Sequence, residues 1–152
     1  MPRLDAERIA LWRELCISVD AVRRRIDREL DDEHAMPLAW FECLGAIRDA
    51  GGTMRVHELR EVLHEVPSSL SRRLDRLEDE GWVERKHTPL PGDRRAVSVT
   101  ITSMGRAEWR DANVTYRRLV QQHFAQHLTD TDIAALQLVL RKVGRPAEMP
   151  SE

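Results

Sequence analysis

The chain has 152 residues, of which 41% are hydrophobic and 33% charged, with a formal net charge of −2 and two cysteines. This length predicts a single domain, and the composition excludes a disordered chain and a disulfide-stapled scaffold. The charged N-terminus lacks a signal-peptide core and no apolar run approaches the roughly 18 residues of a membrane span, so we expect a cytoplasmic protein that has no membrane partner.

Arginine dominates the basic residues, since only Lys86 and Lys142 among the 24 are lysines. Arginine suits bidentate contacts to phosphate and guanine better than lysine does. A GC-rich genome explains the same bias, so the positions of the arginines have to decide between the two.

Apolar spacing predicts helices in the first part of the chain. From residue 5 to about residue 30, apolar side chains recur every three or four positions, which predicts a long amphipathic helix that ends in the acidic stretch 31–33. Pro37 fits the first turn of a second helix, which the glycines at 51–52 end. Residues 53–55 are too short for an independent strand but can pair at a sheet edge.

Two further helices are predicted around a tight turn. Residues 56–63 predict a short third helix, and residues 66–69 read as a turn with a cap. Leucines spaced i, i+4 and i+7 from Leu70 to Leu77 predict a fourth helix, and Gly81 stands where a C-terminal glycine cap belongs. The period then changes to two, which predicts strands over 82–87 and 96–101.

Long helices are predicted again after these strands. Thr102 or Ser103 caps a helix that runs to about Leu128, and a capping-box pattern at 129–132 opens the last helix. We expect the tail 146–152 to be loose. The element order predicts a mostly α fold with a small β-wing, namely a winged helix-turn-helix flanked by long helices.

The fourth helix has separate apolar, acidic and basic faces. At about 100° per residue, serine and arginine side chains share an arc of about 100° whose centre lies roughly 110° from that of the leucines. This arc holds Ser69, Arg72, Arg73 and Arg76. Arginine pairs with guanine edges, serine reads bases or phosphate, and the helix N-terminus at Ser68 offers free N–H groups to a phosphate. A solvated charged face is the alternative interpretation.

The loop between the two strands, residues 88–95, carries Asp93, Arg94 and Arg95. A basic tip beside a recognition helix can reach the minor groove, where the negative potential attracts arginine. The alternative is an ordinary polar turn with a local ion pair.

These segments resemble the MarR family of bacterial regulators. The run from Leu70 to Val83, which includes Ser71, resembles the family's recognition helix and first wing strand. Residues 93–106 resemble its wing signature, D-x-R, a strand and L-T-x-x-G, with Ile101 in place of the usual leucine.

The resemblance implies a homodimer in which the first, fifth and sixth helices of both copies interlock. Its two winged lobes would bind a pseudo-palindromic operator in double-stranded DNA, most often as a repressor that an effector releases. Arg95 would enter the minor groove, oriented by Asp93, and Arg94 would lie near the DNA backbone. The expected division is 1–34 and 103–145 for dimerisation and 36–101 for DNA binding.

The long terminal helices carry more apolar residues than a small winged lobe can cover. Residues that fit a shared dimer core are Leu119, Val120, Phe124, Ile133, Leu136, Leu140 and Val143. Packing within one chain is the alternative.

A small aromatic or phenolic effector is expected in the family's ligand cleft. The candidate lining residues are Trp12, Cys16, Trp40, Phe41 and Tyr116. The Tyr116 hydroxyl and a cation from Arg95 or Arg23 would bind a carboxylate, unless these residues are plain core.

Other chemistries find less support. Cys16 is a candidate redox sensor, but it lies on an apolar face, as Cys43 does, and a buried cysteine is usually inert. His123 and His127 are spaced i, i+4, with Glu33 and His34 as possible further ligands, yet an interface histidine pair fits better than a metal site. No catalytic or cofactor motif is present, so we expect neither an enzyme nor a cofactor. A protein-interaction module without operator binding is the remaining alternative.

Overall fold

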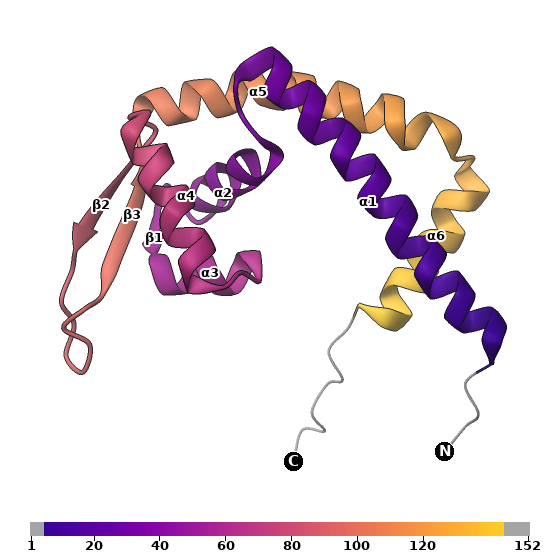
Figure 1. Ribbon diagram of the computed structural model, residues 1–152, viewed down its shortest axis with the longest axis horizontal. Helices are drawn as coiled ribbons and strands as arrows, with labels where there is room; N and C mark the ends of the chain where they lie inside the picture. The colour runs from indigo at the N-terminus through magenta and orange to yellow at the C-terminus, as the bar shows by residue number, and fades with distance from the viewer. Residues whose placement is uncertain (1–4, 145–152) are drawn as a thin grey trace.

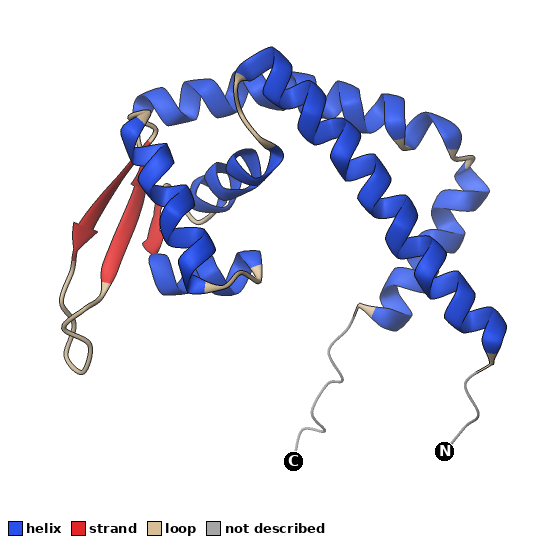
Figure 2. Ribbon diagram, in the orientation of Figure 1, coloured by secondary structure: helices blue, strands red, loops and turns tan. Residues whose placement is uncertain are grey.

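The computed structural model describes residues 5–144, which form a mostly helical chain with one small sheet (Figures 1 and 2). The helices are α1 (Ala6–His34), α2 (Leu38–Asp49), α3 (Val56–Leu63), α4 (Pro67–Asp79), α5 (Ser103–His123), the 3-10 turn η1 (Ala125–His127) and α6 (Asp130–Val143). The strands are β1 (Thr53–Arg55), β2 (Val83–His87) and β3 (Val97–Ile101). The predicted fold class is confirmed, while the tail 146–152 lies outside the described residues.

The elements form a winged lobe and two helical arms. The winged lobe, residues 38–101, contains α2, α3, α4 and the sheet. Helix α5 leaves the sheet and packs along α1. The arms, which we define as residues 6–20 of α1 and all of α6, lie away from the sheet (Figure 1).

The three strands form an antiparallel sheet in the order β1-β3-β2. Thr53 pairs with Thr100 and Val83 with Ile101, so β3 is the central strand. The two threonine hydroxyls lie 2.9 Å apart and form a cross-strand hydrogen bond. The prediction that residues 53–55 pair at a sheet edge is confirmed.

The core lies inside the winged lobe and reaches into the junction of α1 with α5. Side chains with at most 1% of their surface exposed come from seven elements and the loop between α1 and α2: Leu30, Met36, Cys43, Leu44, Ile47, Leu59, Leu70, Leu74, Leu77, Val83, Val99, Ala112 and Leu119. The three leucines of α4 are among them, because their i, i+4, i+7 spacing places them on one side of the helix.

Helix α1 runs through the acidic stretch that was predicted to end it. The helix ends at His34, and Ala35 takes a left-handed conformation (φ 49°) while its N–H bonds the Asp31 carbonyl at 2.8 Å. Acids are unfavourable at a helix C-terminus, but Arg118 of α5 binds Glu33 at 2.5 Å. Arg118, which offsets the charge of Glu33, lies 85 residues away in the sequence, so rules based on neighbouring residues do not predict this contact.

Helix α5 ends at His123, five residues before the predicted end near Leu128. Phe124 leaves helical geometry (φ −135°, ψ −66°), although neither glycine nor proline stands there. The side chain of Gln126 donates to the Gln122 carbonyl at 2.7 Å and thereby satisfies a group that a longer helix would bond. Helix α6 then opens with the predicted capping box, in which Thr129 and Asp132 bond each other's backbone N–H.

The turns follow the predicted glycine and capping signals. Gly81 has φ 78°, and the Trp82 N–H bonds the Leu77 carbonyl at 2.9 Å, which closes the end of α4. Thr102 caps α5 by accepting from the Gly105 N–H at 3.0 Å. A Cβ at Gly105 would lie 2.2 Å from the Trp82 carbonyl oxygen, so this position requires glycine. Among the described helices, none is both long and apolar enough to cross a bilayer.

Candidate nucleic-acid interface

Helices α3 and α4 form a helix-turn-helix at the surface of the winged lobe. His64 ends α3 in the left-handed region (φ 53°), and the chain turns through Glu65 and Val66 into α4. Pro67 occupies the first turn of α4, where its missing N–H costs nothing. Val66 gives no side-chain cap, so the first N–H groups of α4 stay free for another acceptor.

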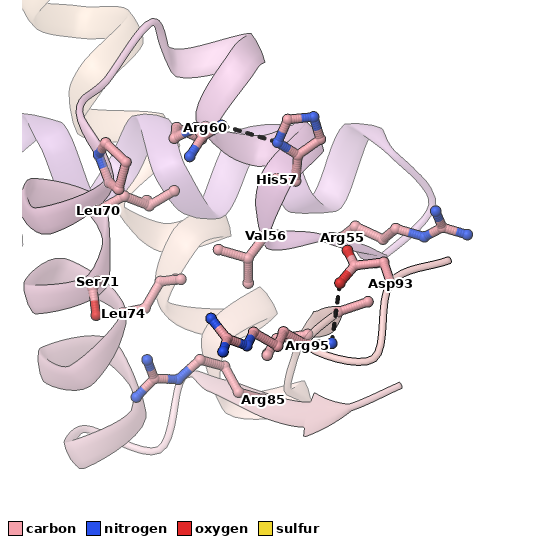
Figure 3. A pocket seen from close by; sticks show the side chains of 13 residues that line it. Arg55, Val56, His57, Arg60, Leu70, Ser71, Leu74, Arg85, Asp93 and Arg95 are labelled. Atoms are coloured by element: carbon pink, nitrogen blue, oxygen red, sulfur yellow. Dashed lines mark hydrogen bonds between the residues drawn. The ribbon is translucent and has the colours of Figure 1, made fainter. Parts of the chain in front are cut away.

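One side of α4 remains open. Ser68, Ser69, Arg72 and Arg76 are exposed on it. Within residues 5–144 neither Arg72 nor Arg76 forms an ion pair, so both guanidinium groups are available to an outside partner. Ser71 is also exposed but lies to the side, where it lines a cavity (Figure 3).

Arg73 is placed differently from its expected neighbours. Its side chain is 14% exposed and pairs with Glu65 in the turn before α4. At about 100° per residue, Arg73 stands about 40° from Leu77 on the helix circumference, nearer to the core than Arg76 or Ser69. This angular position is the sequence signal that separates Arg73 from the outward arginines.

Arg85 of β2 covers the acidic side of α4. Its guanidinium bonds Asp75 and also reaches Glu78 with its Nε, 3.0 Å from Oε2. The hydrogen bond from Arg85 lowers the pKa of Glu78 below its usual value. Arg85 thereby links the recognition helix to the wing, a role that sequence reasoning missed because the partners belong to different elements.

The wing tip is ordered by backbone contacts. Asp93 Oδ1 accepts from the Arg95 N–H at 3.0 Å, and the His87 ring bonds the Arg94 carbonyl at 2.6 Å. Gly92 has φ 89°, which permits the tight turn. The side chains of Arg94 and Arg95 are exposed, and Asp93 acts on the backbone of the turn.

A cavity of about 340 Å³ lies between α3, α4 and the wing. Four arginines line it: Arg55, Arg60, Arg85 and Arg95. Figure 3 shows the Arg95 side chain extending from the wing toward α4, beside the apolar Val56 and Leu74. The cavity thus combines an apolar floor with a positive rim.

The predicted effector residues do not form one site. The Phe41 ring is buried and stacks on the Trp109 ring with centroids 5.3 Å apart. The centroid of the Tyr116 ring lies 4.6 Å from that of Phe41. The Trp40 ring packs edge-on against the Trp82 ring, with centroids 5.8 Å apart.

Trp12 lies far from these rings. Its side chain is 65% exposed and stands 21 residues before Glu33, which contacts α5, so about 30 Å of helix separates the two ends. Cys16 is half-buried on the same arm. Arg23, one of the expected cations, pairs with Glu42 at 2.7 Å.

The alternative redox and metal residues are also engaged elsewhere. Cys43 is fully buried, and burial raises the pKa of its thiol to about 12. His123 ends α5 and pairs with Glu29 at 2.6 Å, whereas His127 lies in η1 and bonds the Gln122 carbonyl at 3.1 Å. The two histidines therefore do not share a helix face, and the part of the chain that is described contains no metal-binding group of three or more such side chains.

Comparisons with known proteins agree with this geometry. A family model described as MarR family matches residues 34–96. The multiple antibiotic resistance protein MarR of Escherichia coli is 36% identical over 129 residues, which cover 82% of this chain and 87% of the relative. The regulator PecS of Dickeya dadantii is 32% identical over 103 residues, which cover 64% of this chain and 57% of PecS.

Solved structures show the same fold. A mutant MarR of Escherichia coli complexed with operator DNA aligns with a TM-score of 0.76 at 32% identity, over 92% of this chain and 99% of that one. A MarR family transcriptional regulator of Streptomyces coelicolor in complex with DNA aligns with a TM-score of 0.81 at 26% identity, over 99% and 97% of the two chains. The chain therefore belongs to the MarR family, whose members are transcriptional regulators and not enzymes.

Proposed function

We propose that this chain is a dimeric, sequence-specific DNA-binding regulator, and that it represses transcription until a small effector releases it. The observation that carries the proposal is the open side of α4, where Arg72 and Arg76 have no ion-pair partner among residues 5–144, next to a wing tip with two exposed arginines. Two structural neighbours, solved with DNA, support this choice of partner.

Helix α4 would enter the major groove with its open side. Arg72 and Arg76 would read guanine edges or bind phosphate, and the free N–H groups near Ser68 and Ser69 would bind a backbone phosphate. Asp75 would not repel the DNA strongly, because Arg85 already neutralises it.

The wing would bind beside this helix. Arg95 would swing out of the cavity into the minor groove, while Asp93 keeps the turn in place through the Arg95 N–H. Arg94 would contact the nearby phosphate backbone.

The exposed apolar residues of the arms support a dimer. Ile17 on α1 and Val143 on α6 have 69% and 72% of their surface exposed, and Leu140 has 56%. A second copy would cover these faces and set the spacing of the two winged lobes on a pseudo-palindrome. In this proposal residues 1–34 and 103–145 serve dimerisation and residues 36–101 bind DNA, although Leu119 and Val120 belong to the chain's own core.

The cavity beside α4 supports an anionic aromatic or phenolic effector. Its volume of about 340 Å³ is at the lower end for small-molecule sites, which run from about 300 to 1,000 Å³. A carboxylate held there by Arg95 would keep Arg95 away from the minor groove. Effector binding and DNA binding would then exclude each other.

A DNA-binding titration tests the proposal. Fluorescence anisotropy would compare the duplex upstream of the protein's own gene with a scrambled duplex of equal length, using wild type and Arg76→Ala. We expect specific binding by the wild type and a loss of about 1–3 kcal/mol in the variant if Arg76 reads a base. Equal, negligible binding to both duplexes would instead favour a protein-interaction module.

A DNA-binding measurement with and without peroxide tests the redox alternative. Operator affinity that is lost on peroxide treatment and kept in Cys16→Ser would favour sensing by Cys16. We expect affinity to be unchanged by peroxide in both proteins.

A further inference from the structure

The recognition helix α4 is tied to its surroundings by an ion pair that is largely hidden from solvent. Arg73, in the second turn of α4, binds Glu65, which lies in the turn between α3 and α4. The side chains are 14% and 21% exposed, far less than those of the arginines on the open side. The pair therefore connects α4 directly to the turn that precedes it.

Glu65 depends on Arg73 for its charge compensation. Its second oxygen, Oε2, is buried and has no hydrogen-bond partner in the described chain. Breaking one side of such a buried pair leaves an uncompensated charge, which is costly in a site of low dielectric. The pair thus resists any movement of α4 that would separate the two groups.

Arg73 also reaches a third element. Burial raises the pKa of the Cys43 thiol of α2, and the charge of the nearby Arg73 guanidinium opposes that shift. Arg73 consequently binds the turn before α4 and lies near the helix beneath it. Leu70, Leu74 and Leu77 hold the depth of α4 in the core but, as apolar contacts, they are not directional.

The angular position of Arg73 gives the pair control over rotation. Arg73 stands about 60° from Arg76 and about 100° from Arg72 around the helix axis. On the other side of α4, Arg85 holds Asp75 and Glu78. A turn of the helix about its axis would break one of these two contacts and would change where Arg72 and Arg76 point.

We propose that Arg73 and Glu65 are positioning residues for DNA recognition, which fix the rotation of α4 and do not touch DNA themselves. This inference rests on the proposed DNA-binding function. It gives Arg73 a different role from its neighbours Arg72 and Arg76, although all three share one arc in the sequence.

The test is a double-mutant cycle read at several salt concentrations. Arg73→Met, Glu65→Gln and the double variant would be titrated with a duplex that the wild type selects from a random-sequence pool. We expect each single variant to lose affinity about tenfold and the double variant to lose no more than either one, because both remove the same interaction. The dependence of log affinity on log salt should stay unchanged.

Arg76→Met is the matched control, an exposed arginine on the same helix. If Arg76 binds phosphate, its loss should lower the salt slope by about one, and if it reads a base, it should relax specificity. The proposal is wrong if Arg73→Met lowers the salt slope by about one while Glu65→Gln binds like wild type. It is also wrong if both single variants bind like wild type.

Hydrogen exchange of the free protein separates a positioning effect from unfolding. In both single variants we expect faster exchange of α4 amides and unchanged exchange in α1 and α5. If Arg73→Met unfolds, Arg73→Lys, which keeps the charge but not the planar fork, should stay folded and still lose affinity. A wild type that selects no sequence from the pool would overturn the proposed function, whereas unchanged α4 exchange in the variants would overturn the positioning role alone.

Discussion

The winged lobe and the arms share the same apolar spacing but bury it very differently. In the lobe, Leu74 and Leu77 are 0% exposed. In α6, Leu140 and Val143 follow the same helical period and are 56% and 72% exposed. The spacing of apolar residues therefore shows that a helix has an apolar face, but the tertiary structure decides whether the same chain covers that face. The difference predicts that substitutions in the two regions act on different equilibria.

The largest effect is expected in the lobe. Leu74→Ala removes a fully buried side chain beneath the recognition helix and should cost about 2–5 kcal/mol of unfolding free energy, because it leaves a cavity. Urea denaturation followed by circular dichroism measures this loss. A cost below about 1 kcal/mol would mean that α4 is not held by its leucines in the way that burial indicates.

The next effect is expected in the arms and concerns association. Leu140→Asp places a charge on an exposed apolar face and should weaken the proposed dimer by about 2 kcal/mol or more, with little change inside each lobe. Sedimentation equilibrium measures the change, and Gln137→Asp, on the same helix, is the control. A wild-type protein that is monomeric at micromolar concentration would refute the dimer, and with it this reading of the arms.

A smaller effect is expected at the wing tip. Arg95→Ala should weaken operator binding by about 1 kcal/mol, because one minor-groove contact is lost while the turn survives through Asp93. Anisotropy titrations at fixed salt measure this change, with the thermal unfolding midpoint as a check on folding. Unchanged affinity and unchanged sequence preference would remove the wing from the interface.

The smallest effect is expected at the contact between α4 and β2. Arg85 lowers the pKa of Glu78, so this contact stabilises the fold above the ordinary pKa of the carboxyl, and the contribution is lost as pH falls through the lowered value. Solvent screens the half-exposed pair, which keeps the contribution below about 1 kcal/mol.

Comparing Glu78→Gln with wild type at pH 7 and pH 3 reads out this contact. The difference in unfolding free energy should be present at pH 7 and shrink at pH 3. A difference that grows toward acid pH would contradict the assigned direction of the pKa shift.

The sequence predicted those parts of the fold that depend on near neighbours. The cap at Thr129, the glycine at Gly81 and the leucine spacing of α4 each act within about one or two helical turns, so a short window contains the whole signal. The wing motif from Asp93 to Gly105 belongs to the same class.

Only the tertiary structure decided the features that join distant segments. The sequence alone placed Arg73 among the outward arginines, ended α1 within its acidic stretch and carried α5 past Phe124. Two of these predictions changed because a side chain has its partner in another segment: Arg73 pairs with Glu65 in the turn before α4, and Glu33 pairs with Arg118 of α5. The end of α5 is set beside Phe124, where the Gln126 side chain bonds the Gln122 carbonyl. Local rules give the element and its faces, whereas long-range charge pairs and burial assign each face its partner.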